Sequence, residues 1–132
     1  MKLYLASFLE EDNFGPGRLI CIARGNKPWS IEVDIVFAPF VPTQELMSKY
    51  REMADTGQEG AGEMFQTSFQ KQLDAFYDKV LKKSEETKQT PQEVLPFQEG
   101  DTLCSWEREH RTHYRKQIES VLVKLGYDII SK

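Results

Sequence analysis

The sequence contains few cysteines and no long apolar segment. Its two cysteines, Cys21 and Cys104, each lie inside an apolar run, whereas a disulfide framework needs more cysteines placed in turns. No stretch approaches the roughly 20 apolar residues of a membrane-spanning helix. The N-terminus has neither the apolar core nor the cleavage site of a secretory signal. We therefore expect a soluble, cytoplasmic protein with free thiols and no association with a membrane.

The sequence also lacks an excess of positive charge and the common cofactor motifs. Its net charge is -4, and no basic run stands apart from acidic residues. Binding to a nucleic-acid backbone requires a concentrated positive surface, so we do not expect a nucleic-acid partner. The glycine turns at 15–18 and 24–29 fit neither a phosphate-binding loop nor a dinucleotide fingerprint, and no paired-cysteine knuckle accompanies the histidines. We therefore expect no cofactor and no metal.

The chain does contain short apolar runs that are typical of strands. Its 132 residues are the length of one ordinary domain, and its composition is that of a globular protein. The apolar runs predict five strands, at 2–8, 18–24, 31–37, 101–107 and 127–130. The run at 18–24 is apolar almost throughout, which is typical of a strand covered on both faces. The alternation at 31–37 indicates a half-exposed strand at a sheet edge.

Amphipathic segments between these runs predict three helices. Thr43 can cap the first, and the second, over 62–83, has an apolar stripe that repeats every three or four residues. The polar segment 83–92 predicts a mobile surface connection. Thr112 can cap the last helix, over 113–126, whose place between two strands predicts a right-handed crossover with parallel pairing. The sequence thus predicts a single α/β domain with a parallel-leaning sheet of about five strands and three or four helices.

The turn between the fourth strand and the last helix concentrates polar functional groups. In open α/β sheets, ligands collect at the carboxyl ends of the strands, where helix N-termini favour anions. This turn contains both histidines, His110 and His113, together with Glu107 and several arginines, among them Arg115. Such groups can bind a phosphate or carboxylate and transfer a proton near neutral pH. A solvated turn without a function has the same polarity, and the residue pattern alone leaves both interpretations open.

Cys104 and Arg24 are two further candidates. A nucleophilic thiol needs a pKa lowered by a nearby cation or helix N-terminus, which the position of Cys104 before the last helix can supply. A cysteine in a strand is more often inert packing, so that interpretation stays open for Cys104, and we assign Cys21 to the core. Arg24 ends a buried strand, so its side chain is expected to face solvent or a ligand.

Three regions of the chain contain motifs that together resemble those of one protein family. They are LYLASF with LICIARGNKPW, FAPFVPTQELMSKY with FQTSFQKQL, and TLCSWEREHRTHYRKQIESVLVKLGYDI. Taken together, these regions resemble domain-of-unknown-function family 488 over most of the chain. The resemblance implies an α/β domain but no particular activity. In the first motif, Ser7 matches the serine that follows the opening strand of the family, and Cys104, Glu107 and Arg115 match the cysteine, glutamate and arginine of its closing unit.

The chain departs from the pattern of the family at two points. One extra residue separates Cys104 from Glu107, and His113 and Tyr114 stand where the family has Cys-His. A reaction that needed that second cysteine or that histidine would not proceed unchanged in this chain, although His113 can be considered as a substitute.

Two functional hypotheses follow from the sequence, and they leave open whether the protein is an enzyme. In the first, the protein binds or, as an enzyme, processes a small anionic ligand such as a nucleotide phosphate at the turn 104–115. The residues that it assigns are Arg24, Arg115, His110 and Ser7 for ligand binding, and Cys104, Glu107 and His113 for catalysis. In the second, the protein is a non-catalytic interaction domain with a degenerate site, able to form oligomers. An exposed patch formed by Trp29, Phe40 or Trp106 would support the second hypothesis.

Overall fold

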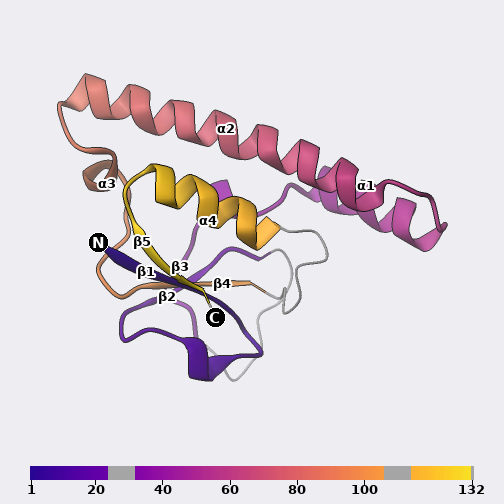
Figure 1. Ribbon diagram of the computed structural model, residues 1–132, viewed down its shortest axis with the longest axis horizontal. Coiled ribbons are helices and arrows are strands. Elements are labelled where there is room, and N and C mark those ends of the chain that lie inside the picture. Colours follow the sequence, from indigo (N-terminus) through magenta and orange to yellow (C-terminus); the bar gives the residue numbers. More distant parts are fainter. Residues whose placement is uncertain (24–31, 106–113, 132) are drawn as a thin grey trace.

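Within residues 1–23, 32–105 and 114–131, which the computed structural model describes, five parallel strands form one sheet (Figure 1). In their order across the sheet the strands are β3 (Ile35–Val36), β2 (Leu19–Cys21), β4 (Thr102–Ser105), β1 (Lys2–Ser7) and β5 (Asp128–Ser131). All four strand pairings are parallel. The predicted α/β class with a parallel sheet is therefore confirmed.

The helices of the described residues connect these strands. They are η1 (Glu11–Asn13), η2 (Ala38–Phe40), α1 (Gln44–Asp55), α2 (Ala61–Thr87), α3 (Pro91–Val94) and α4 (Tyr114–Lys124). The predicted cap of α1 is confirmed, because the Thr43 side chain accepts a hydrogen bond from the backbone N–H of Leu46. None of the described helices is both long enough and apolar enough to cross a membrane.

The prediction of a mobile connection over 83–92 is wrong for most of that segment. Helix α2 continues to Thr87, and Pro91–Val94 form α3. The lysines and glutamates at the end of α2 are good helix formers, so a polar composition does not end the helix. The helix ends instead at Lys88, whose φ of 56° places it in the left-handed region.

The main core lies between one face of the sheet and the helices. Figure 1 shows α4 and α2 lying on this side of the sheet. The strands contribute the alternate residues Leu3, Leu5, Ile20 and Leu103, and all four are at most 1% exposed. The helices contribute the apolar stripes predicted from their periodicity, Phe65, Phe69, Leu73, Ile118 and Leu122. This packing fixes α4 over the centre of the sheet, so its first turn lies near the carboxyl ends of the central strands.

A smaller apolar cluster lies on the opposite face of the sheet. Its buried members are Phe8, Cys21, Ala23 and Cys104. These residues alternate with those of the main core along each strand, as the pleat of a strand requires. The segment that contains η1 lies on this side of the sheet (Figure 1). The assignment of Cys21 to the core is confirmed.

Strand β3 is shorter than the sequence predicts, although its place at the sheet edge is confirmed. The structure assigns only Ile35–Val36 to it, whereas the prediction covered 31–37. The side chain of Asp34 accepts a hydrogen bond from the backbone N–H of Leu19, 2.9 Å away. The backbone N–H of Asp34 in turn donates to the Leu19 carbonyl at 2.8 Å, so Asp34 pairs with β2 through one backbone and one side-chain hydrogen bond, and the regular pairing covers only Ile35 and Val36.

Candidate functional site

The carboxyl ends of β1 and β4 bring two serines together. Ser7 and Ser105 are neighbours in the register of these strands, and both are buried, at 0% and 1% exposure. The Ser7 hydroxyl accepts a hydrogen bond from the backbone N–H of Leu9, 3.2 Å away. The Ser105 hydroxyl has no hydrogen-bond partner among the described residues. A buried hydroxyl without a partner is rare because it forfeits its hydrogen bonds with water, so Ser105 is a candidate contact for a bound group.

Arg115 lies over the same edge of the sheet, in the first turn of α4. Its side chain is almost fully buried, and Nη2 donates a 2.7 Å hydrogen bond to the backbone carbonyl of Leu5 in β1. Its Nη1 lies 3.5 Å from Oε1 of Glu10, whose side chain is 23% exposed. Burial of a guanidinium carries a large desolvation cost, which these two acceptors offset. The carboxyl edge of the sheet therefore holds a buried positive charge near the end of β1 and two buried hydroxyls at the ends of β1 and β4.

Tyr114 fixes the orientation of this turn of α4. Its hydroxyl donates a 3.1 Å hydrogen bond to the carbonyl of Ile22, directly after β2, and its ring packs against Phe65 and Phe69 of α2. Adjacent residues of α4 thus contact the ends of two different strands, Tyr114 near β2 and Arg115 at β1. This arrangement positions the guanidinium independently of any ligand.

Cys104 does not have the properties that a nucleophile requires. The residue is 0% exposed, and burial raises the pKa of its thiol to about 12, with a smaller contribution from Cys21. Arg115 acts in the opposite direction but does not compensate. Since only the thiolate is a strong nucleophile, a thiol with this pKa stays protonated at neutral pH. The environment of Cys104 argues against the predicted catalytic role and agrees with the packing interpretation.

Three of the seven predicted site residues lie in the described part of the chain. Ser7, Cys104 and Arg115 are all found at the carboxyl edge of the sheet, with Cys104 in the cluster on the face opposite the helices. The other four, Arg24, Glu107, His110 and His113, lie outside the described residues.

Glu10 and Ser105 at this edge were not among the residues predicted from the sequence. The same rule that selected the turn after β4, namely that ligands collect where parallel strands end, also applies to β1. Glu10 follows the end of β1 by three residues, and Ser105 is the last residue of β4. A systematic reading of both strand ends would have selected them.

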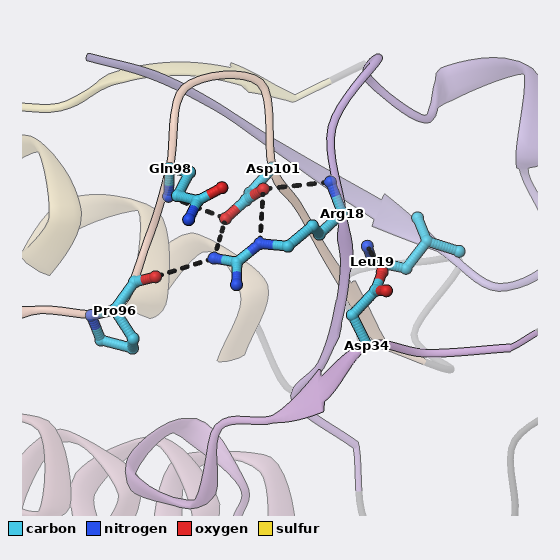
Figure 2. A network of polar contacts seen from close by, with 6 residues as sticks. All are labelled: Arg18, Leu19, Asp34, Pro96, Gln98 and Asp101. Atoms are coloured by element: carbon cyan, nitrogen blue, oxygen red, sulfur yellow. Dashed lines mark hydrogen bonds and ion pairs between the residues drawn. The ribbon is translucent and has the colours of Figure 1, made fainter.

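A second polar network lies at the opposite, amino edge of the sheet (Figure 2). Arg18, just before β2, forms an ion pair with Asp101, just before β4, with Nη2 at 2.8 Å from Oδ2. Burial alone would raise the pKa of Asp101, but hydrogen bonds from the Arg18 side chain and from the backbone N–H groups of Gln98 and Arg18 lower it below its usual value. The hydrogen bond to Asp101 in turn raises the pKa of Arg18. Both carboxylate oxygens of Asp101 accept hydrogen bonds from other residues of the fold. We therefore interpret the Arg18–Asp101 pair as a structural clamp and not as a ligand site.

The described residues include no cluster of three or more potential metal ligands. We also compared the chain with known proteins. No family model, curated protein or solved structure matches it. The resemblance to domain-of-unknown-function family 488 therefore stays a prediction, and the function has to be argued from the site itself.

Proposed function

We propose that the protein binds a small anionic ligand, such as the phosphate of a nucleotide, at the carboxyl edge of the sheet. The observation that carries this proposal is the buried guanidinium of Arg115, held by the Leu5 carbonyl near the carboxyl end of β1, where β1 and β4 end in the buried serines Ser7 and Ser105. A guanidinium is a planar group with five N–H donors, and it matches phosphate and carboxylate oxygens with two parallel hydrogen bonds.

The location of Arg115 supports this proposal. Ligands of parallel α/β sheets bind outside the carboxyl ends of the strands, and Arg115 lies there in the first turn of an 11-residue helix. Backbone N–H groups and the helix dipole favour an anion at such an N-terminus. The buried Ser105 hydroxyl supplies a further donor that has no use within the described residues.

Glu10 gives the site a second chemical component. Its carboxylate lies against Arg115 and remains partly exposed. A ligand with an anionic group and a neighbouring hydroxyl or amine would therefore find a cation for the first and an acceptor for the second. Proton transfer to or from such a ligand remains a part of the proposal for Glu107 and His113, which lie outside the described residues.

Thermal-shift measurements with inorganic phosphate, pyrophosphate and nucleoside mono-, di- and triphosphates test the proposal. At least one of these anions should raise the Tm of the wild-type protein in a concentration-dependent manner. The variants R115A and R115K should weaken the apparent affinity at least about tenfold, since a charge-assisted hydrogen bond contributes about 1.5–3 kcal/mol. R115K keeps the charge but loses the planar fork, so it remains informative where R115A destabilises the fold.

R51A is the matched control. It removes an exposed arginine from α1, away from the sheet edge, and should respond to the anions as the wild type does. The proposal fails if none of the anions stabilises the wild type at millimolar concentration, or if R115K responds as strongly as the wild type.

The alternative of a non-catalytic interaction domain gains no specific support. An exposed aromatic patch that included Phe40 would have supported it, but Phe40 is 0% exposed and packs against Phe37 and Phe76. The other two aromatic residues of that hypothesis, Trp29 and Trp106, lie outside the described residues.

A further inference from the structure

The only two cysteines of the sequence are direct neighbours in the sheet. Cys21 at the end of β2 and Cys104 in β4 are partners in the parallel register, although they are far apart in the chain. Both are free thiols, and both belong to the apolar cluster on the face opposite the helices. The sequence analysis considered each cysteine separately, so it did not foresee this pair.

The spacing of the two strands suits a covalent bridge. Neighbouring strands of a sheet lie about 4.8 Å apart, and side chains of register partners project from the same face. A disulfide tolerates distances of about 4.4–6.8 Å between the two Cα atoms. The proximity of the thiols is also apparent in their electrostatics, because Cys21 contributes to the raised pKa of Cys104.

We propose that Cys21 and Cys104 are a modification site, a dithiol that a small peroxide closes to an intramolecular disulfide between β2 and β4. In the first step the Cys21 thiol loses its proton and the thiolate attacks one oxygen of hydrogen peroxide, which gives a sulfenic acid and a hydroxide that takes up this proton as water. In the second step the Cys104 thiol, which the strand register holds next to the Cys21 sulfur, attacks that sulfur and displaces the hydroxyl group, and its proton leaves with the hydroxyl as water. The high pKa of Cys104 slows its reaction with reagents from solution, whereas this step is intramolecular and needs no encounter. Two thiols and one peroxide thus become one disulfide and two waters.

The surroundings of the pair select the oxidant and the order of the steps. Cys21 retains 6% exposure, whereas Cys104 retains 0%, so the peroxide reaches Cys21 first. The neighbouring side chains of Phe8 and Ala23 are apolar and buried, so a bulky disulfide reagent would have to displace them to reach the thiols. A peroxide is close to water in size and carries no charge, which suits a site of this kind. The inference is independent of the proposed anion site, because it uses neither Arg115 nor the serines.

The experiment exposes the folded full-length protein to hydrogen peroxide, unfolds it in the presence of N-ethylmaleimide, and records the intact mass. The wild type should lose two hydrogen atoms and add no maleimide, and a proteolytic digest should contain a peptide in which Cys21 is joined to Cys104. After reduction, both cysteines should alkylate. The single variants C21S and C104S are the matched controls, and neither should form an intramolecular bridge.

Peroxide treatment of the urea-unfolded wild type is the comparison. It distinguishes a bridge that depends on the folded geometry from one that forms when two thiols of a flexible chain meet by chance. In the folded protein the intramolecular bridge should make up most of the oxidised product, whereas the unfolded protein should give a larger share of sulfinic acid and intermolecular dimer. The proposal is overturned if both cysteines of the treated folded protein still alkylate, if oxidation yields only sulfinic acids or intermolecular dimers, or if the bridged peptide appears only in urea.

Discussion

The carboxylate of Asp101 binds the guanidinium of Arg18 in a bidentate manner, with Nη2 at 2.8 Å from Oδ2 and Nε at 3.3 Å from Oδ1 (Figure 2). The same carboxylate accepts backbone N–H groups from Arg18 at 3.0 Å and from Gln98 at 2.8 Å. Arg18 also donates to the carbonyl of Pro96. One buried side chain therefore joins the start of β2 to the turn that precedes β4.

Replacing Asp101 by alanine should lower the free energy of unfolding by about 3 kcal/mol. The substitution leaves two backbone N–H groups without their acceptor, and it removes the partner of a guanidinium that is 31% exposed. Urea denaturation followed by circular dichroism measures the change. R18A should lower the free energy of unfolding by less, about 1 kcal/mol. A partly exposed ion pair is screened by solvent, and Asp101 keeps its backbone N–H donors in this variant. If the free energy of unfolding of the Asp101→Ala variant lay within about 0.5 kcal/mol of the wild-type value, the Arg18–Asp101 pair would not be a structural clamp.

The stability contribution of Asp101 should depend on pH in the acidic range. Its pKa in the folded protein is lowered, so the folded state binds the proton more weakly than the unfolded state does. The contribution is thus fully present above the unfolded-state pKa of about 4 and is lost as the pH falls through the lower, folded-state value. Urea midpoints of the wild type and of D101N should differ at neutral pH and converge below about pH 4. A constant difference across this range would show that the carboxylate charge is not involved.

Much of the fold is predictable because it depends on local patterns. The alternation in the strands and the apolar stripe of α2 each depend on neighbouring residues, and the structure contains these elements near their predicted positions. The wrong predictions occur where a contact between residues far apart in the chain determines the local structure. Strand β3 covers only Ile35–Val36, and before it the Asp34 side chain accepts a hydrogen bond from Leu19 of β2, a partner 15 residues away that a sequence pattern does not reveal.

The candidate site is less predictable for the same physical reason. Strand order decides which residues meet, and the order β3-β2-β4-β1-β5 places β4 between two strands from the beginning of the chain. Only this order makes Ser105 a neighbour of Ser7 and Cys104 a neighbour of Cys21. Local patterns show that these residues lie at the ends of strands, but they do not show which strands are neighbours in the sheet.

Gly17→Ala should destabilise the protein by about 2 kcal/mol or more, since overpacking a rigid contact costs about 1–3 kcal/mol. A Cβ atom at this position would lie 2.7–2.9 Å from backbone atoms of Gly100 and Asp101. The Gly17 N–H also donates to the Gly100 carbonyl at 3.0 Å, so neither backbone can move without loss of this bond. Urea denaturation provides the measurement.

Gly57→Ala is the matched control for Gly17. A Cβ atom at Gly57 would contact nothing within 4 Å, and the cost there arises only from its φ of +68°. That strain amounts to about 1 kcal/mol. If Gly17→Ala destabilised the protein no more than Gly57→Ala does, the close approach between the loops before β2 and β4 would not be required.

Alkylation of Cys104 by iodoacetamide should be at least about 100-fold slower in the folded protein than in urea. Measured on the C21S variant, the reaction reports Cys104 alone. Its pKa of about 12 leaves a thiolate fraction at neutral pH about three orders of magnitude below that of an unfolded thiol with a pKa near 8.5. The rate in the folded protein should also continue to rise above about pH 9, where the rate in urea levels off. A folded-state rate equal to the rate in urea would mean that the thiol is activated, and it would restore the nucleophilic role predicted from the sequence.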